Sequence, residues 1–515
     1  MYVRTHAHAT PDKAALIDQA GAVLTYAELD ARSNQLAHYL RGLGLTRGDH
    51  IAAVMENCPT YLVIVWAALR SGLYVTPVNS HLTGPETGAI VKHCEAQVLL
   101  TSERLLEVAA VARVEAPLCR AGLVIGSSTE NFESFDAAIS GLATTPVPDE
   151  SQGSLQYYSS GTTGQPKAFI RPLPDEPVDS GPPNSTVIKN IHGFDEHTIY
   201  LSPAPLYHAA PSAFSVAVQT FGGTVVLMER FDAREALRLI EAHRVSHSQW
   251  VPTMFVRMLG LPEQERTRFD HSSLRHAVHS AAPCSIMVKQ AMIDWWGPII
   301  TEYYGGSEGI GGTWIDSEQW LSHHGSVGKS RFGVAHIVND GGLEVPVGQT
   351  GVIYFENREF DAGYAKDPDA NRSQRLDDHP DWATYGDVGY VDDEGYIYLT
   401  DRASFMIVSG GVNIYPREIE DVLSEHPAVA DVAVIGVPNE EFGEEVKAIV
   451  ELWSQYSPSD ELAEELIDWC RPRLAGYKRP RSVEFIDVLP RMPTGKLAKG
   501  PLRAPYWVNH DSRII

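Results

Sequence analysis

The chain has 515 residues, of which 43% are hydrophobic and 21% are charged, as is ordinary for globular proteins. At about 150 residues per domain, this length predicts two or more structural units with a large buried core. Acidic residues number 66 against 41 Lys and Arg, so the formal net charge is −25. This balance argues against a nucleic-acid-binding or anionic-membrane-binding surface spread over the whole molecule, but it permits a local basic pocket for a small anion.

Cysteine usage and the first residues bear on the cellular compartment. The five cysteines are scattered and form no CxxC pair, which is typical of a reduced intracellular protein rather than a disulfide scaffold or a zinc ribbon. The N-terminal segment lacks the apolar core of a secretory signal. The most continuous apolar run, Tyr61–Leu69, is far shorter than the roughly 20 residues that span a bilayer. We therefore expect a cytoplasmic protein without integral membrane association.

Helix and strand signals alternate in the first part of the chain. Thr25 and Glu28 form a capping box before an amphipathic run, which predicts a helix start. A short apolar run, Ile51–Met55, predicts a strand, Pro59 opens a second helix through Leu69, and Tyr74–Pro77 predicts the next strand. This alternation indicates a mostly parallel sheet with helices on both faces.

A proline-rich and acidic tract, Pro172–Ser185, predicts an exposed surface loop. Strand and helix signals return over Val216–Val256.

The end of the chain predicts a compact α+β unit of roughly 110 residues, a plausible size for an independent domain. The signals in order are strands at Gly395–Thr400 and Phe405–Val408, a helix from Pro416, strands at Val432–Val437 and Val446–Leu452, a helix capped by Ser457–Asp460 and running to about Leu474, and a strand at Val483–Ile486. We place the boundaries at residues 1–400 for the large domain, 401–404 for a hinge and 405–515 for the small domain.

A loop rich in hydroxyl groups and glycine, Tyr157–Lys167, is the strongest candidate for binding an anion. Glycine lets a backbone approach an anion closely, and a turn of successive N–H groups forms an anion-binding concavity. The hydroxyls add donors and Lys167 adds a point charge, which suits a polyphosphate. The spacing is not that of a Walker A loop.

The string Tyr303–Gly309 has two interpretations. It fits the G-x-S-x-G nucleophile elbow of hydrolases, with Ser307 as nucleophile, but an elbow needs a following helix and Gly311 comes almost at once. Otherwise Glu308 is a hard oxygen ligand for Mg²⁺ on a nucleotide, and Tyr304 is a stacking surface for a base.

Three further strings are weak alone. Asp387, in a Gly-Asp turn, offers a carboxylate to the two hydroxyls of a ribose, and Arg402 offers a guanidinium to a phosphate. A Pro-Thr-Gly-Lys string ends at Lys496, and His208 follows Leu206-Tyr207. A lone histidine beside apolar residues is more often part of the core than catalytic.

Together and in chain order, the strings SSGTTGQPK, LYHAAP, YYGGSEG, YGDVGY, DRASFMIVSGGVNIYPREIE and PTGK resemble the adenylate-forming superfamily. Its members include acyl-CoA and aryl-CoA synthetases, peptide-synthetase adenylation domains and firefly luciferase. The resemblance covers nearly the whole chain, and the run Asp401–Glu420 is most similar to bacterial synthetases that act on fatty or aromatic acids. It implies a large α/β N-terminal domain with layered sheets and helices, plus a small mobile α+β C-terminal domain that rotates between the two half-reactions.

The resemblance implies a two-step reaction that uses ATP, Mg²⁺ and coenzyme A. A small-molecule carboxylic acid attacks the α-phosphate to give an acyl adenylate and pyrophosphate, and the thiol of CoA then displaces AMP. Catalytic roles fall to Lys496, His208 and Glu308, with Thr162 joining Glu308 at the metal. Nucleotide binding falls to Ser159, Ser160, Gly161, Thr162, Thr163, Gly164, Lys167, Ala282, Tyr304, Gly305, Ser307, Asp387 and Arg402. The acyl pocket falls to His208, Ala209, Trp250, Ala281 and Gly306, and the CoA tunnel to Ser409, Gly410 and Gly411.

The sequence departs from the superfamily pattern in two places and leaves alternatives open. Ala168-Phe169 stands where Gly-Val is usual, and Ser404-Phe405 stands at the hinge where a charged residue and Asp are usual. Trp250 is either a flat wall of the acyl pocket or simply core. Alternatives for the function are an acceptor other than CoA (an amine, a carrier-protein thiol or nitrite), a serine hydrolase using Ser307, and a non-catalytic ATP-binding regulator. We expect no nucleic-acid partner, and both a monomer and a homodimer remain open.

Overall fold

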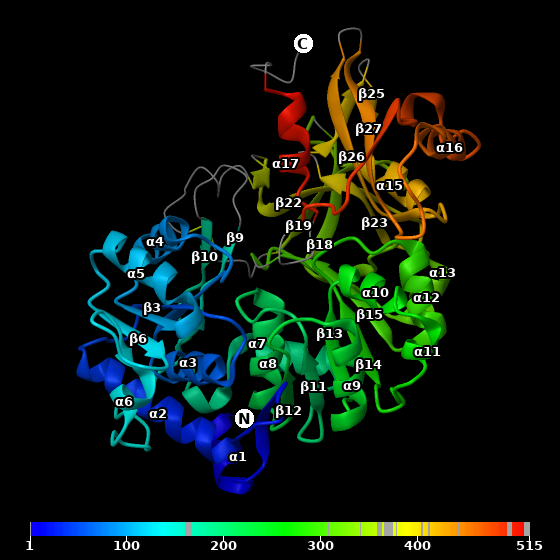
Figure 1. The fold of residues 1–515 in the computed structure, drawn as a ribbon. Helices are drawn as coiled ribbons and strands as arrows, with labels where there is room; N and C mark the ends of the chain where they lie inside the picture. Colours follow the sequence, from blue (N-terminus) through cyan, green and yellow to red (C-terminus); the bar gives the residue numbers. More distant parts are fainter. Residues whose placement is uncertain are drawn as a thin grey trace. The chain divides into compact units, whose positions relative to one another are not determined.

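The structure is a computed structural model that describes residues 2–159, 167–306, 308–339, 341–357, 363–364, 374–376, 378–402, 405–409, 412–439, 442–491 and 497–508 (Figure 1). The chain forms two compact units. Unit 1 comprises Met1–Trp250, Gly260–Ala277 and Asp361–Asn371, and unit 2 comprises Val251–Leu259, Val278–Phe360 and Arg372–Ile515.

Unit 1 contains a parallel sheet in the order β7-β6-β5-β3-β4-β8. Its strands are β3 (His50–Val54), β4 (Tyr74–Val78), β5 (Val98–Ser102), β6 (Ala121–Ile125), β7 (Glu133–Ser134) and β8 (Ser154–Leu155). The predicted strands at Ile51–Met55 and Tyr74–Pro77 are therefore confirmed, and so is their parallel arrangement.

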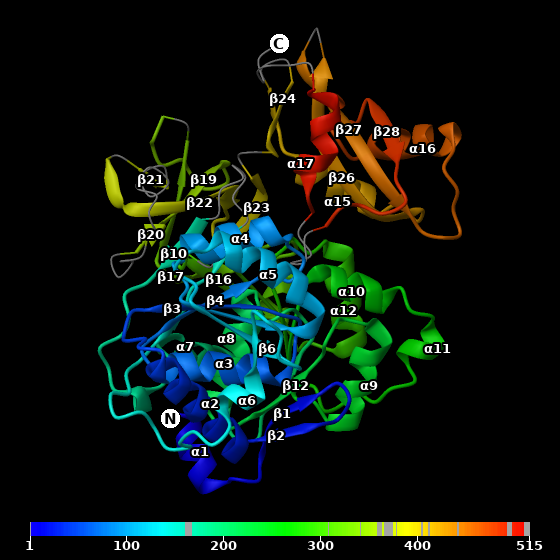
Figure 2. The same ribbon diagram turned by 60° about the vertical axis from the view of Figure 1, so that its left-hand side comes forward.

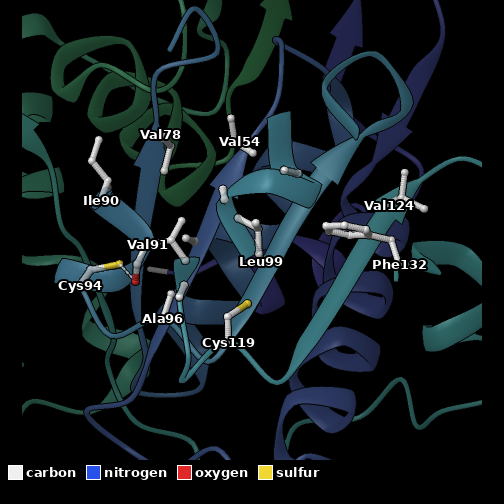
Figure 3. Close-up of a cluster of buried hydrophobic side chains, with 14 residues drawn as sticks. Val54, Val78, Ile90, Val91, Cys94, Ala96, Leu99, Cys119, Val124 and Phe132 are labelled. Atoms are coloured by element: carbon white, nitrogen blue, oxygen red, sulfur yellow. Dashed lines mark hydrogen bonds between the residues drawn. The ribbon is translucent and has the colours of Figure 1, made fainter. Parts of the chain in front are cut away.

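The helices of this layer begin where the sequence predicts. Helix α2 (Tyr26–Gly42) starts with a complete capping box between Thr25 and Glu28, and α3 (Pro59–Arg70) has Pro59 in its first turn. Helices α4 (Gly84–His93) and α5 (Leu106–Glu115) pack side by side (Figure 2). Figure 3 shows the core that they form with the sheet, in which Val91 of α4, Leu99 of β5 and Val124 of β6 are all fully buried.

A second group of strands in unit 1 has the order β13-β11-β12-β1-β2, with parallel pairing except at the edge strand β2. These strands are β1 (Ala14–Asp18), β2 (Val23–Thr25), β11 (Ile199–Ser202), β12 (Thr224–Leu227) and β13 (His247–Trp250). Helices α1 (Val3–Ala9), α6 (Phe135–Ile139), α7 (Pro183–His192), α8 (Ala209–Thr220), α9 (Ala233–His243) and α11 (Glu263–Arg266) also belong to the unit, together with a small sheet of β9 (Tyr158–Ser159), β10 (Lys167–Ile170) and β20 (Gly363–Tyr364).

The predicted loop at Pro172–Ser185 is only partly correct. Its last residues begin α7, with Pro183 in the first turn, where the missing N–H of proline costs no helix hydrogen bond. Val178 and Ser185 are buried, at 6% and 3% exposure. The apolar spacing after Pro183 is too short to reveal this helix from the sequence.

Unit 2 contains an antiparallel run of β15 (Ile300–Gly305), β16 (Gly312–Ile315) and β17 (Lys329–Phe332). It also contains α10 (Pro252–Leu259), α12 (Ile286–Trp296) and α13 (Ser317–Ser322), while β14 (His276–His279) spans the division between the units. A further antiparallel sheet comprises β18 (Val334–Val338), β19 (Gly351–Glu356), β21 (Arg375–Leu376), β22 (His379–Val391) and β23 (Ile397–Arg402).

The α+β portion at the C-terminal end of unit 2 contains the strands and helices predicted after residue 404, and it adds β25 and α17, which the sequence did not predict. Its strands are β24 (Ile407–Ser409), β25 (Val412–Ile414), β26 (Val429–Asn439), β27 (Gly443–Leu452) and β28 (Ser482–Phe485), and its helices are α15 (Pro416–Ser424), α16 (Asp460–Cys470) and α17 (Lys499–Arg503). Alternate residues of β26 belong to opposite cores: Val432 and Val434 pack with α15 and α16, and Ala433 and Ile435 pack with Leu502 of α17.

The predicted end of the second of these helices, at about Leu474, is wrong. Helix α16 ends at Cys470 because Pro472 has no N–H with which to continue it. The α/β layers and the α+β portion are confirmed, but the boundaries at 400 and 405 stay predictions. In the portion of the chain that the structure describes, no helix is long and apolar enough to cross a membrane, and the five cysteines are free thiols.

Candidate nucleotide-activating site

A bulge in β22 takes three residues of the Tyr-Gly-Asp string out of the β19–β22 pairing. Val352 of β19 pairs with Val388, and Tyr354 pairs with Thr384, so Tyr385–Asp387 stand opposite Ile353 alone. The Thr384 hydroxyl closes the bulge by donating to the Ile353 carbonyl at 2.6 Å and accepting from the Gly386 amide at 2.9 Å. Bulges often redirect side chains beside active sites, and here Tyr385 and Asp387 leave the pairing with β19, while Asp387 stays paired with β23.

The bulge brings Asp387 to Tyr304, the residue before the last of β15. The Tyr304 hydroxyl donates to Asp387 Oδ2 at 2.7 Å, and Asp387 is only 8% exposed. Asp387 also lies opposite Arg402 in the β22–β23 register. The structure therefore joins two residues that the sequence assigned separately to a nucleotide base and a ribose.

The ring of Tyr385 packs edge-on against the ring of Tyr304. The two ring centroids are 5.9 Å apart at 82°, and the Phe355 ring is 6.2 Å from Tyr385. The Tyr385 hydroxyl donates to the Gly311 carbonyl at 2.8 Å and accepts from the Gly311 amide at 3.2 Å. Burial raises the pKa of Tyr385 to about 12, so the hydroxyl remains a donor at neutral pH. The sequence string contained this tyrosine, but no pattern assigned it a role.

The turn between β15 and β16 carries Glu308 and has room only for glycine at two positions. A Cβ at Gly306 would stand 2.3 Å from Glu308 Oε2, and one at Gly311 would stand 2.2 Å from Phe355. Strand β16 follows this turn directly, so the helix that a nucleophile elbow requires is absent among the residues described after it. The elbow interpretation is therefore wrong, although Ser307 itself lies outside the described residues.

Glu308 is the metal-ligand candidate that the structure describes. Over the described residues, no group of three or more His, Cys, Asp or Glu side chains could hold a metal ion. A single carboxylate suits Mg²⁺ that arrives on nucleotide phosphates, because that ion keeps several waters and takes few protein ligands. The donor set therefore fits a nucleotide-borne Mg²⁺.

A buried ion pair that the sequence gave no sign of supports the strand leading to Tyr304. Lys289 Nζ of α12 lies 2.6 Å from Glu302 Oε2 of β15, and their side chains are 1% and 9% exposed. Burial favours a higher pKa for Glu302, but Lys289, His279 and Arg417 together oppose it, Lys289 most strongly, and the pKa lies below its usual value. His279, 3.5 Å from the same oxygen, has a pKa lowered by burial to about 4, so Lys289 supplies the positive charge at pH 7.

His208 and Ala209 lie at the start of α8 in unit 1. His208 is the N-cap residue, and its ring is 4.4 Å from that of Tyr207 in an edge-on arrangement. Burial raises the pKa of Tyr207 above its ordinary value. Ala209 is the first residue of the helix.

Trp250 ends β13 and is 0% exposed. Its indole N–H donates to Ser248 Oγ at 2.7 Å, and its ring meets Phe231 edge-on at 6.4 Å. The sequence left open whether Trp250 lines the acyl pocket or belongs to the core. These contacts favour the core, because the indole is fully buried and its N–H already has a hydrogen-bond partner.

The remaining predicted residues are placed less completely. Ala281, with a φ of +74°, and Ala282 belong to unit 2, and Ser409 ends β24 opposite Val412. The backbones of Ser159 and Lys167 pair with each other in β9 and β10. The predicted residues outside the described portion are Ser160, Gly161, Thr162, Thr163, Gly164, Ser307, Gly410, Gly411 and Lys496.

The chain was also compared with known families, proteins and solved structures, and it matches members of one family over nearly its whole length. A family profile described as AMP-binding enzyme matches residues 3–365, and one described as AMP-binding enzyme C-terminal domain matches residues 418–496. The chain is 34% identical to feruloyl-CoA synthase of Amycolatopsis sp over 96% of both chains. It is 31% identical to long-chain-fatty-acid–CoA ligase FadD13 of Mycobacterium tuberculosis, over 98% of this chain and 97% of the relative. The solved structure of o-succinylbenzoate CoA synthetase (MenE) from Bacillus subtilis with its acyl-adenylate intermediate matches with a TM-score of 0.80 and 26% identity, over 99% of this chain and 98% of that chain.

Proposed function

The chain belongs to the AMP-binding enzyme family, and we propose from that premise that it is an acid–CoA ligase that forms an acyl adenylate. The observation that carries the proposal is the pairing of Tyr304 with Asp387 beside the turn that carries Glu308. An aromatic face, a nearly buried ribose acceptor and a carboxylate for a nucleotide-borne cation are the three features that a Mg-ATP site needs.

In the first half-reaction, an oxygen of the substrate carboxylate attacks the α-phosphorus of ATP. A bond forms between them, the bond to the bridging oxygen of the β-phosphate breaks, and pyrophosphate leaves. Such displacements depend on positioning and charge neutralisation more than on covalent help from the protein. Lys496 bridges the carboxylate and the α-phosphate, and His208 borders the carboxylate. Mg²⁺ held by Glu308 and Thr162 would neutralise phosphate charge.

The remaining nucleotide contacts come from residues that the family motifs share. Asp387 accepts the ribose hydroxyls, the ring of Tyr304 packs on adenine, and Arg402 binds phosphate. The triphosphate lies against the loop of Ser159, Ser160, Gly161, Thr162, Thr163, Gly164 and Lys167, and Ala282, Gly305 and Ser307 complete the nucleotide site.

In the second half-reaction, the thiolate of coenzyme A attacks the acyl carbon, the thioester forms and AMP leaves. The small C-terminal domain turns about residues 401–404 between the steps, withdrawing Lys496 and presenting Ser409, Gly410 and Gly411 to the thiol. Motions of this scale gate the reaction rather than supply the chemistry.

We propose an aromatic or fatty acid as the substrate. The names of the relatives support both classes, since one is a feruloyl-CoA synthase and another a long-chain-fatty-acid–CoA ligase. His208, Ala209, Ala281 and Gly306 would line the acyl site, with Trp250 supporting it from the core.

Mass spectrometry of the purified protein tests the proposal. Mg-ATP would be supplied with a panel of aromatic acids and of fatty acids from short to long chain, each with and without coenzyme A. We expect AMP and one class of acyl-CoA, and free acyl adenylate when CoA is left out. Acyl adenylate that never passes to CoA would overturn the choice of acceptor, and release of pyrophosphate with no dependence on any acid would overturn the ligase.

A further inference from the structure

Tyr385 is the one side chain of the bulge for which the proposed reaction has no use. It stands between Gly386, whose φ is +79°, and the paired Thr384, where the β22 ladder breaks. Its ring packs with Tyr304 and Phe355, against a core that includes Ile353. The ring is therefore fixed by apolar neighbours while the hydroxyl points to the β15–β16 turn.

That hydroxyl holds both polar backbone atoms of one residue. It donates to the Gly311 carbonyl and accepts from the Gly311 amide, so a single side chain satisfies the two groups that strand pairing would otherwise satisfy. Gly311 cannot be replaced without collision with Phe355, so the backbone is pressed against the core at this point.

The ring of Tyr385 also reaches the opposite end of the turn. A Cβ on Gly306 would lie 2.5 Å from Tyr385 Cε1 and 2.3 Å from Glu308 Oε2. The tyrosine ring and the glutamate carboxylate thus meet over the same glycine. The side chain contacts the turn at both ends, and Glu308 lies between them.

We propose that Tyr385 is a positioning residue for Glu308, because it clasps the turn at Gly306 and Gly311 and holds the carboxylate where Mg-ATP meets it. The inference rests on the proposed function. A turn with this many glycines has large conformational freedom when nothing holds it, and each freed residue must be ordered again when the nucleotide binds. Because Tyr385 orders the turn before the nucleotide arrives, nucleotide binding does not have to supply the conformational entropy of ordering it.

Tyr385→Phe tests the proposal, because it removes the hydroxyl and keeps the ring. We expect the half-saturating concentrations of Mg²⁺ and ATP to rise about fivefold to tenfold, the size expected for one or two lost neutral hydrogen bonds. The KM values for acid and CoA should stay within about twofold, and the unfolding temperature should hardly change. Tyr390→Phe, on the same strand and stacked on Tyr398, is the matched control and should leave Mg²⁺ dependence unchanged.

Two further readouts separate positioning from general damage. Hydrogen–deuterium exchange of the peptide that contains Gly311 should accelerate about tenfold in Tyr385→Phe without nucleotide, while peptides of β19 stay as protected as in the wild type. In a double-mutant cycle with Glu308→Gln, the loss caused by Tyr385→Phe should largely vanish, since a residue that acts through Glu308 has nothing left to position.

Three results would contradict the proposed role of Tyr385. Unchanged exchange at Gly311 would overturn the clasp, and faster exchange with unaltered Mg²⁺ dependence would overturn its role in positioning Glu308. Additive losses in the double mutant would do the same. If the wild-type protein formed no AMP in response to any acid, the proposed function would be contradicted instead. Hydrogen–deuterium exchange at Gly311 would still show whether Tyr385 holds the turn.

Discussion

The hydrogen bond from Tyr304 to Asp387 orients the carboxylate that we propose as the acceptor of the ribose hydroxyls. Asp387 is 8% exposed, and the Tyr304 hydroxyl donates to its Oδ2 at 2.7 Å, so burial and this hydrogen bond together restrict the rotation of the carboxylate. A carboxylate held this way accepts ribose hydroxyls without first losing rotational freedom. The same tyrosine supplies the ring for the base, so a single residue would serve two parts of one nucleotide.

Tyr304→Phe should therefore weaken ATP binding while leaving the ring in place. We expect the dissociation constant of ATP to rise by at least about tenfold, the lower end of the roughly 1.5–3 kcal/mol attributed to hydrogen bonds with charged groups. Isothermal titration calorimetry with ATP, with and without Mg²⁺, measures it. Binding as tight as in the wild type would mean that Asp387 needs no help from this hydroxyl.

The buried ion pair of Lys289 with Glu302 should make the stability of the fold depend on a single residue. Lys289→Met would leave the Glu302 carboxylate buried without its cation, and we expect a loss of about 3–5 kcal/mol in unfolding free energy. Lys289→Met combined with Glu302→Gln should recover most of that loss, because no buried charge then remains.

Urea denaturation followed by tryptophan fluorescence measures both variants. Arg471→Ala is the control: its pair with Asp468 has 64% and 62% side-chain exposure, so its removal should change stability by less than about 0.5 kcal/mol. A Lys289→Met protein as stable as the wild type would show that Glu302 finds another partner or takes up a proton.

At the scale of elements, three histidines join helix α7, strand β13 and the start of β14 within unit 1. His192 Nδ1 lies 2.7 Å from His276 Nε2, and the His247 ring is 6.0 Å from that of His276. Burial lowers the pKa of His247 and of His276 to about 4 and that of His192 well below its ordinary value. Arg275 lowers the pKa of His247 further, and Asp195 opposes it.

This cluster predicts that unit 1 loses stability in mild acid. The histidines are neutral when folded but take up protons when unfolded below about pH 6.5, so stability present at pH 7.5 falls as the pH drops toward 4. Each proton gained only on unfolding lowers the unfolding free energy by about 1.4 kcal/mol per pH unit.

Urea denaturation of the intact protein at pH 7.5, 6.5 and 5.5 measures how steeply the unfolding free energy changes with pH. His276→Phe should reduce this pH dependence by the equivalent of about one proton. His197→Gln, whose side chain is 80% exposed, should leave it unchanged. A slope that is flat in the wild type would mean that the folded state accepts these protons.

The sequence predicted helix starts and strands correctly where the signal lies in residues that are close together in the chain. The capping box at Thr25, the proline at Pro59 and the strand at Val432–Val437 each concern near neighbours in the chain, and each was confirmed. The end of α16 was missed because the apolar period continued past Pro472. The His192–His276 contact and the Lys289–Glu302 pair left no trace in the sequence, because they depend on which elements pack together.

The candidate site was predicted as separate strings rather than as contacts. The sequence singled out Tyr304, Glu308 and Asp387 but gave no sign that Tyr304 would donate to Asp387, or that Tyr385 would hold Gly311. Both contacts arise from the bulge opposite Ile353, and a bulge shifts the register by an amount that alternating hydrophobicity does not encode.

At the scale of the whole molecule, the protein has a formal net charge of −25, and the substrates of the proposed reaction, a carboxylate, ATP and coenzyme A, are also anions. The net negative potential of the protein does not help to attract or stabilise the nucleotide. A positively charged side chain at the reacting phosphate should therefore contribute strongly to the reaction rate. We propose Lys496, near the end of the match to the C-terminal family profile, as this cation, and on that proposal it contributes to the first half-reaction only.

Lys496→Ala should thus separate the two half-reactions. We expect acyl adenylate formation from acid and Mg-ATP to fall by at least about 100-fold, the loss typical of removing one group that stabilises developing charge. Thioester formation from supplied acyl adenylate and CoA should stay near the wild-type rate, since Lys496 would then be withdrawn. Lys478→Ala, which breaks an ion pair with Glu418 in the same domain, is the matched control and should preserve both rates. Equal losses in both half-reactions would mean that Lys496 maintains the domain rather than the adenylation step, whereas an intact adenylation rate would place the bridging cation elsewhere.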